Sequence, residues 1–334
     1  MNGAEPLDIA VIGLGLIGGS ALRALAAAGH RVLGYDADPT TRATARTAAA
    51  RAPQGARWQV TGTVADAVSP ADVVLLAVPL PAVEAIFGEL ATSGYSGLVT
   101  DVTSVKQPVR ELAAKTLHAA GQSLAGFVGG HPMAGRERSG FGASEAELFD
   151  GCAWVLCLEE GTGLDDWLRL AALFTAIGAR VVPTTADEHD RAVAAVSHVP
   201  HLLAASLAGH AANDPLALTL GAGSFRDGTR VAASRPGLVA AMCGGNAEAA
   251  RHTLDAVIAD LQAARAALDG PDPIAALEPW LTPGYTARSR WPVTPGTPEP
   301  MRADPSALRA LGRAGGWVTT VDAARRTVVA VRPA

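Results

Sequence analysis

The stretch that decides the fold lies near the N-terminus and reads Asp8-Ile9-Ala10-Val11-Ile12-Gly13-Leu14-Gly15-Leu16-Ile17-Gly18. Its apolar beginning, up to Ile12, is typical of a buried strand. An alanine-rich segment with helical spacing follows as far as Gly29, and Arg31 to Tyr35 indicates a second strand. This part of the chain therefore predicts a βαβ unit.

The glycine spacing, GxGxxG, is that of a turn that binds a dinucleotide. In such a turn Gly13 makes the tight bend, Gly15 lets a pyrophosphate approach the backbone, and Gly18 lets the helix pack closely on the strand. The first N–H groups of the helix then face the phosphates. A turn that binds nothing would need strand, spacing, helix and a following acid to coincide by accident, so we expect a dinucleotide.

The choice of dinucleotide depends on Asp36, which follows the second strand 18 residues after Gly18. A carboxylate there accepts hydrogen bonds from the ribose hydroxyls and repels a 2′-phosphate, which favours NAD over NADP. Arg42 is a cation that can also lie near this ribose. The residues expected to bind NAD are Gly13, Gly15, Leu16, Ile17, Gly18, Asp36 and Val78.

Further strand signals alternate with helical patterns through the first half of the chain. We expect strands over residues 72–78, 98–102, 126–130, 153–158 and 179–182, with a helix over 164–177 before the last of them. Strands separated by helices predict an α/β fold with a doubly wound parallel sheet. The first expected domain is a Rossmann-type NAD-binding domain of residues 1–186.

From Asp187 onward the chain is rich in alanine and leucine, and residues 187–282 predict an all-helical substrate and dimerisation domain. Apolar side chains on more than one helical face favour a homodimer, because such helices must be covered on several sides. Residues 283–334 indicate a proline-rich linker and a short C-terminal segment, with a helix over 306–313 and a hairpin over 317–331.

Composition bounds the class of protein. The chain has 334 residues, of which 49% are hydrophobic and 18% charged, and its net charge is −5, so it is a folded globular protein and not a nucleic-acid-binding one. Its three cysteines lack the spacing of a disulfide framework or a zinc site. No basic leader and no segment of membrane-spanning length is evident. We expect a cytoplasmic protein without nucleic-acid or membrane partners.

Two polar clusters follow expected strands, at the edge where open α/β sheets bind ligands. The first is Asp101-Val102-Thr103-Ser104-Val105-Lys106, whose hydroxyls, taken alone, favour a helix N-cap. The second, residues 129–140, holds His131 between glycines and a proline. In the helical half, His198 and His201 share a helical face. Because Pro200 disturbs that helix and no acid has zinc-protease spacing, we expect no metal there.

Taken in order, the motifs resemble those of prephenate dehydrogenases. They are the glycine fingerprint, Asp-x-x-Ser-Val-Lys, His-Pro-Met-Ala-Gly-Arg-Glu-x-Ser-Gly, Ser-His-x-Pro-His and Phe-x-Asp-x-Thr-Arg, and they extend over about residues 8–281. The resemblance implies oxidative decarboxylation of prephenate to 4-hydroxyphenylpyruvate in tyrosine biosynthesis, with NAD. It implies His131 and Ser104 as catalytic residues and Arg230 as the carboxylate ligand. It also places His201, Glu137, Asp190 and Asp227 around the pocket, and Arg136, close to His131 in the sequence, is the next candidate to bind the carboxylate.

The sequence departs from many relatives after Arg230, where Arg235 and Val239 stand in place of an aspartate and a tryptophan that help to close the site. The 29 residues after Pro305 are too few for a complete regulatory domain of the ACT type. Control by tyrosine through such a domain is therefore not expected.

A neutral histidine suits the chemistry. Hydride leaves the ring carbon that bears the hydroxyl group, and a nearby group must accept the hydroxyl proton at the same time. The alternative substrate is arogenate, which carries an ammonium group; Arg136 and Arg138 favour the dianionic prephenate. A β-hydroxyacid or imine reductase would use a lysine or aspartate on the long helix instead. A non-enzymatic NAD-binding redox sensor would leave His131, Ser104 and Arg230 without roles.

Overall fold

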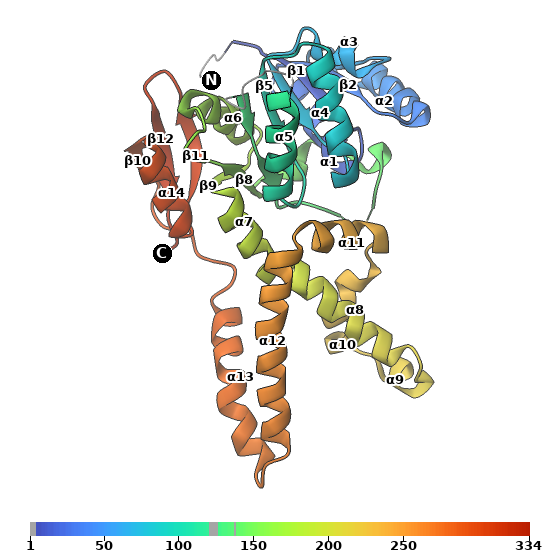
Figure 1. Ribbon diagram of the computed structural model, residues 1–334, viewed down its shortest axis with the longest axis vertical. Coiled ribbons are helices and arrows are strands. Elements are labelled where there is room, and N and C mark those ends of the chain that lie inside the picture. The colour runs from blue at the N-terminus through green and yellow to red at the C-terminus, as the bar shows by residue number, and fades with distance from the viewer. Residues whose placement is uncertain (1–4, 120–125, 137) are drawn as a thin grey trace. The chain divides into compact units, whose positions relative to one another are not determined.

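The computed structural model describes residues 5–119, 126–136 and 138–334 (Figure 1). The chain forms two compact units. The first comprises Met1–His189 together with Pro298–Arg332, and the second comprises Asp190–Thr297 with Pro333–Ala334. The C-terminal strands thus fold with the first unit, although the helices that precede them in sequence belong to the second.

The first unit contains a six-stranded parallel sheet in the order β3-β2-β1-β4-β5-β6. Its strands are β1 (Asp8–Ile12), β2 (Arg31–Tyr35), β3 (Gln59–Val60), β4 (Val73–Leu76), β5 (Leu98–Asp101) and β6 (Phe127–Val128). Its helices are α1 (Leu16–Ala27), α2 (Pro39–Arg51), α3 (Val64–Val68), α4 (Val83–Thr92) and α5 (Gln107–Ala119). The strand order reverses between β1 and β4, which is where doubly wound sheets bind ligands, and the expected Rossmann-type fold is confirmed.

The two central strands are buried on both faces. Ile9 and Val11 of β1 pack into one hydrophobic cluster, whereas Ala10 and Ile12 point into another on the opposite face. Residues of β4 alternate in the same way. Apolar side chains at every position of a parallel strand are what helices on both faces of the sheet require.

A second sheet of the same unit is mixed, with the order β10-β12-β11-β9-β8-β7. Its strands are β7 (Gly130–Pro132), β8 (Ala153–Cys157), β9 (Arg180–Thr184), β10 (Glu299–Arg302), β11 (Trp317–Asp322) and β12 (Thr327–Val331). Only β8 and β9 are parallel, joined by α6 (Leu164–Ala176). The strands expected over 153–158 and 179–182 therefore exist, but they do not extend the parallel sheet, because their edges pair with β7 and β11 instead.

The expected C-terminal helix and hairpin are present as α14 (Pro305–Arg313) and β11–β12. The hairpin adds to the free edge of β9, with Val318 opposite Val181. Leu308, Leu311 and Val328 are buried in the same core as α6. A segment too small to hold a core alone is thus stabilised by the first unit.

The second unit is helical, as expected. Its helices are α8 (Val199–Ala211), α9 (Pro215–Leu220), α10 (Gly223–Thr229), α11 (Pro236–Gly245), α12 (Ala247–Leu268) and α13 (Pro273–Ser289), and α7 (Ala186–Val193) leads into it. Helices α12 and α13 run side by side, and the Trp280 indole N–H donates to the Asp260 carbonyl at 3.1 Å (Figure 1). The boundary expected at residue 283 falls inside α13, because this packing carries the helix through Pro279 and Pro283.

Between α7 and α8 the backbone forms a π-helical turn over Ala194–His198. Pro200 follows it; proline lacks an N–H group and crowds the preceding turn, so the local widening has a physical cause. The helical stretch Ala186–Ala211, with 26 residues, is long and apolar enough to cross a membrane, so the expectation that no segment reaches that length is wrong. This is weak evidence for a membrane, since core helices meet the same criterion.

Candidate active site

The glycine turn after β1 has the geometry of a cofactor cradle. Gly13 has a φ of +97°, and a Cβ there would lie 2.4 Å from the Ala77 carbonyl oxygen. A Cβ on Gly18 would lie 1.9 Å from the Gly13 carbonyl oxygen, so both positions require glycine. At Gly15, by contrast, a Cβ would meet nothing within 4 Å. Packing of the chain explains the glycines at positions 13 and 18, whereas Gly15 borders open space.

That open space faces the start of α1, where no side chain caps the helix. Leu16 and Ile17 are its first two residues, so their N–H groups are among those that an α-helix leaves without internal partners. Val78, just beyond β4, lies against the same turn, 3.1 Å from where a Gly13 Cβ would be. Uncapped N–H groups, a positive dipole end and room beside Gly15 fit a pyrophosphate.

Asp36 is held rigidly at the end of β2. Its Oδ2 accepts a hydrogen bond from the Leu14 N–H at 2.7 Å, and its Oδ1 accepts one from the Asp38 N–H at 2.9 Å. Arg42 donates through Nη1 to the carbonyl oxygens of Asp36 and Ala37, at 2.6 and 3.0 Å, while its buried Nε has no hydrogen-bond partner. A fixed carboxylate and a cation thus stand together where a ribose is expected.

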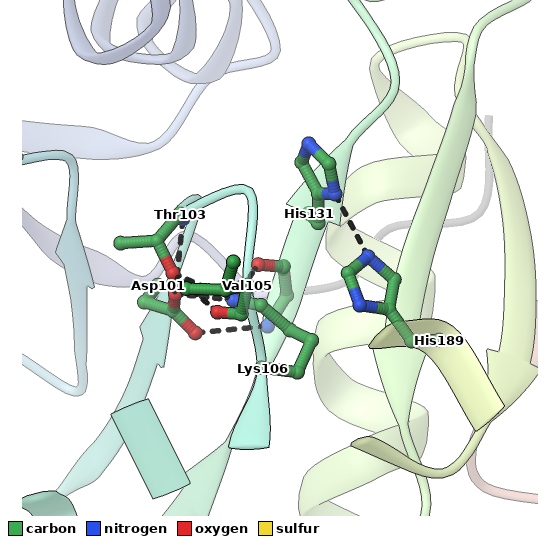
Figure 2. Close-up of polar contacts among 7 residues, drawn as sticks. Asp101, Thr103, Val105, Lys106, His131 and His189 are labelled. Carbon is green, nitrogen blue, oxygen red and sulfur yellow. Dashed lines mark hydrogen bonds and ion pairs between the residues drawn. The ribbon is translucent and has the colours of Figure 1, made fainter. Parts of the chain in front are cut away.

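The Asp101–Lys106 segment forms a buried polar cluster (Figure 2). Lys106 makes an ion pair with Asp101, and both side chains are completely buried. Thr103 donates its backbone N–H to Asp101 Oδ2 at 3.0 Å. Lys106 Nζ also donates to the Gly130 carbonyl at 2.5 Å, and the Gly130 N–H donates to Asp101 Oδ1 at 3.1 Å. The cluster therefore fixes the backbone of the residue before His131.

His131 lies in strand β7, opposite Val155 of β8, and is 9% exposed. The single strand expected over 126–130 is in fact β6 and β7, separated at Gly129, and the chain passes there from the parallel sheet to the mixed one. The sequence placed His131 in a loop after a strand. The pairing of β7 with β8 and the contact of Lys106 with the Gly130 carbonyl hold the backbone here more firmly than a loop would.

The structure adds His189, which was not among the expected site residues. Its Nε2 lies 2.8 Å from Nδ1 of His131, and the rings meet edge to face (Figure 2). His189 is on α7, where Ala186, His189, Asp190 and Val193 are all buried. Their i, i+3, i+4, i+7 spacing marks a core-facing stripe that includes two polar residues, and this was the signal in the sequence that could have found His189.

The other residues of the first unit that the sequence places in the site are Ser104, Arg136 and Glu137. Ser104 is partly exposed in the turn after β5, and because α5 begins at Gln107 it is not the residue that flanks the helix. Arg136 forms a half-exposed ion pair with Glu145 at 2.7 Å. Glu137 lies outside the residues that the structure describes.

The second unit holds the other expected residues. Arg230 is exposed at the start of a 3₁₀ turn, Arg230–Ala233. Burial lowers the pKa of His201, and the positive charge of Arg230 lowers it further, against the opposing effect of a hydrogen bond with the Val231 backbone. Asp227 makes a surface ion pair with Arg226 at 3.2 Å.

Asp190 is buried, and its backbone carbonyl accepts a hydrogen bond from the Asn246 side chain at 2.7 Å. Asn246 Nδ2 also lies 3.1 Å from Nδ1 of His198, so the side chain of Asn246 links the start of this unit to the π-helical turn. Across the described ranges, no three His, Cys, Asp or Glu side chains are grouped as metal ligands would be.

The first unit is a dinucleotide-binding domain, as its strand order and the glycine turn after β1 indicate. It also contains the strand that carries the buried His131, and a helical unit follows it in sequence. Two family models match this chain: the nucleotide-binding domain of prephenate dehydrogenase over residues 20–183, and the dimerization domain of prephenate dehydrogenase over residues 185–274. The chain belongs to the prephenate dehydrogenase family.

Among curated relatives, the cyclohexadienyl dehydrogenase of Zymomonas mobilis is 36% identical over 275 residues, which is 79% of this chain and 89% of that protein. The prephenate dehydrogenase of Bacillus subtilis is 35% identical over 238 residues, or 69% of this chain, but the match spans only 62% of the Bacillus protein.

Among solved structures, a proposed prephenate dehydrogenase of Corynebacterium glutamicum has a TM-score of 0.76 and 37% identity, and the match covers 85% of this chain and 88% of that one. The arogenate dehydrogenase of Synechocystis has a TM-score of 0.72 and 27% identity, covering 85% and 99%.

Proposed function

We propose that this protein catalyses the NAD-dependent oxidative decarboxylation of prephenate to 4-hydroxyphenylpyruvate in tyrosine biosynthesis. The observation that carries the proposal is His131, a buried histidine on the same unit as the cofactor cradle, whose preceding residue Gly130 is held by Lys106 and Asp101. Membership of the family supports the same activity.

Bound NAD would supply the acceptor for the hydride that leaves the ring carbon bearing the hydroxyl group. Gly15 and the uncapped start of α1 would hold its pyrophosphate, and Asp36 would accept hydrogen bonds from the adenosine ribose. His131 takes the hydroxyl proton as that oxygen becomes a carbonyl, and Ser104 orients the same hydroxyl by a hydrogen bond. Departure of the ring carboxylate as carbon dioxide leaves its electron pair in the ring, which becomes aromatic, and the ring oxygen takes the proton back from His131. The gain of aromaticity drives the step forward.

We assign substrate binding mainly to Arg230, whose guanidinium can hold a carboxylate by paired hydrogen bonds. His201 is electrostatically coupled to Arg230, and its lowered pKa keeps it neutral near pH 7, so it can hydrogen-bond the substrate without adding charge. Asp190, Asp227, Arg136 and Glu137 complete the proposed set of binding residues.

Arogenate is the second candidate substrate, because the Synechocystis relative is an arogenate dehydrogenase. Arg136 is paired with Glu145, so part of the positive charge expected to favour the dianionic prephenate is offset. Parallel assays with prephenate and arogenate, each with NAD and NADP, decide between them by the absorbance of the reduced nicotinamide. We expect the highest kcat/KM with prephenate and NAD. Turnover of neither substrate would overturn the proposal.

We further propose that the enzyme is a cytoplasmic homodimer formed through the second unit. Its helices expose large apolar side chains, among them Val196, Leu207, Leu220, Ile258, Ile274 and Tyr285. Many large apolar side chains left exposed on one unit are typical of a protein interface. The three cysteines are all free thiols, as is usual in a reducing compartment. Light scattering should give about twice the 33.9 kDa chain mass, and a stable active monomer would contradict the assembly.

A further inference from the structure

We propose that His189 is a positioning residue that sets the tautomer of His131, so that Nε2 of His131 is the nitrogen that accepts the substrate proton. The inference rests on the proposed function, since it names which nitrogen of the proposed base accepts the proton. It begins from the 2.8 Å separation of His131 Nδ1 and His189 Nε2, both within the first unit (Figure 2).

Two neutral imidazoles at this separation share a single hydrogen. If His131 donates from Nδ1, then His189 Nε2 accepts, and Nε2 of His131 keeps a lone pair. If His189 donates instead, Nδ1 of His131 is the acceptor and its Nε2 carries the proton. In that second arrangement neither nitrogen of His131 can take a proton from a substrate hydroxyl without breaking the contact.

Only the first arrangement serves catalysis, and it also helps during the step itself. When Nε2 of His131 takes the proton, the ring becomes an imidazolium with N–H groups on both sides. His189 Nε2 then accepts from a charged donor, and such hydrogen bonds are stronger than neutral ones. His189 therefore stabilises the protonated product of the transfer, while remaining out of contact with the proton that moves.

The surroundings keep the two rings in place. The Gly130 backbone is tied to Lys106 and Asp101, which fixes the start of the His131 side chain. His189 is 2% exposed on α7, and its backbone N–H donates to the Thr185 carbonyl at 2.9 Å, within the first turn of that helix. Two rings on anchored backbones, packed edge to face, have little freedom to exchange partners.

Three variants of the full-length chain test the role by steady-state kinetics. His189→Leu removes the acceptor, and we expect kcat to fall by about 10²-fold, within the usual range of a general-base contribution, while the KM for prephenate stays within about threefold. His189→Gln presents an amide oxygen near the position of Nε2 and should recover at least about tenfold of that loss.

His30→Leu is the matched control. It removes another partly buried histidine of the same unit, whose Nδ1 accepts a hydrogen bond from the Leu7 N–H at 3.2 Å, and should leave kcat unchanged. A His189→Leu enzyme with wild-type kcat, or a Gln variant no better than the Leu variant, would overturn the positioning role.

Nitrogen-15 NMR of histidine-labelled wild-type protein reads the tautomer directly, with His131→Asn identifying the His131 signals. We expect a protonated Nδ1 and an unprotonated Nε2 near neutral pH; the reverse would overturn the inference even if no His189 variant folds. The two proposals fail separately. A wild-type enzyme that turns over neither prephenate nor arogenate refutes the function, whereas an active enzyme with protonated Nε2 on His131 refutes only the role of His189.

Discussion

Lys106 and Asp101 form an ion pair from which water is excluded, since both side chains are completely buried. Lys106 Nζ also donates to the Gly130 carbonyl at 2.5 Å, so the pair anchors the strand that carries His131. Removal of one partner leaves the other charge buried and uncompensated. Lys106 therefore supports both the stability of the first unit and the placement of His131.

Lys106→Met should lower the free energy of unfolding by about 3–5 kcal/mol, the usual cost of an uncompensated buried charge. Lys115→Met is the control: its ion pair with Glu84 is 74% and 56% exposed. Exposed pairs of this kind contribute less than about 1 kcal/mol. Thermal and urea unfolding of both variants check the contrast. Equal, small losses would show that the Asp101–Lys106 pair does not stabilise the fold.

Gly15→Ala and Gly18→Ala should separate cofactor binding from folding. Gly15 has a φ of −71° and open space around it, so alanine there should leave the melting temperature nearly unchanged. The added methyl would obstruct the pyrophosphate, and we expect the Kd for NAD to rise at least tenfold, or about 1.4 kcal/mol. Calorimetric titration measures it.

At Gly18 the new Cβ would lie 1.9 Å from the Gly13 carbonyl oxygen, so the variant should lose stability, by about 1–3 kcal/mol as for other overpacked sites. For the cofactor, the contradicting result is a Gly15→Ala variant that binds NAD as tightly as the wild type. The pyrophosphate would then not lie beside Gly15.

Asp36→Ser should reduce the preference for NAD over NADP, because the carboxylate that repels a 2′-phosphate is gone. Arg42 already lies at the Asp36 carbonyl, with a buried Nε that has no partner, and is placed to attract that phosphate. The double variant Asp36→Ser/Arg42→Ala should therefore lose the gain in NADP use. The ratio of kcat/KM for the two cofactors is the readout, and equal use by the wild type would show that Asp36 does not contact the ribose.

Arg230→Ala should raise the KM for prephenate by about 10- to 100-fold, the equivalent of about 1.5–3 kcal/mol for a charge-assisted hydrogen bond. Arg251→Ala is the control, because Arg251 is exposed and its ion pair is with Asp255, which is not a proposed binding residue. The same Arg230 substitution should raise the pKa of His201, since a neighbouring positive charge disfavours the imidazolium form. NMR titration measures that shift, and an unaltered KM would move the carboxylate to another residue.

Local patterns in the sequence were enough to predict the parallel sheet, the glycine turn and the helical second half. Each depends on residues within about 30 positions of one another, and the spacing GxGxxG has one steric explanation for each of its outer glycines. The separate mixed sheet was not predictable in this way. Its strands are evident from their composition, but the pairing of Val181 with Val318 joins distant parts of the chain, and periodicity carries no information about partners.

The candidate site shows the same division. The motif around His131 was evident from its residues, whereas its contact with His189 joins positions 58 residues apart. Lys106 belongs to a local motif, but nothing near it in the sequence indicates that its ammonium group reaches the Gly130 carbonyl. The proline composition from Pro283 onward predicts a linker, whereas α13 continues to Ser289 and its Trp280 packs against α12.

The most direct test of the account is the turnover number of His131→Asn with prephenate and NAD. We expect kcat to fall by about 10²- to 10⁴-fold, the range of a general-base contribution, with the KM for prephenate and the Kd for NAD little changed. Wild-type activity should also decline at acidic pH, because a protonated imidazole accepts no proton. A folded His131→Asn enzyme with turnover within a few-fold of wild type would contradict the assignment of His131 as the base.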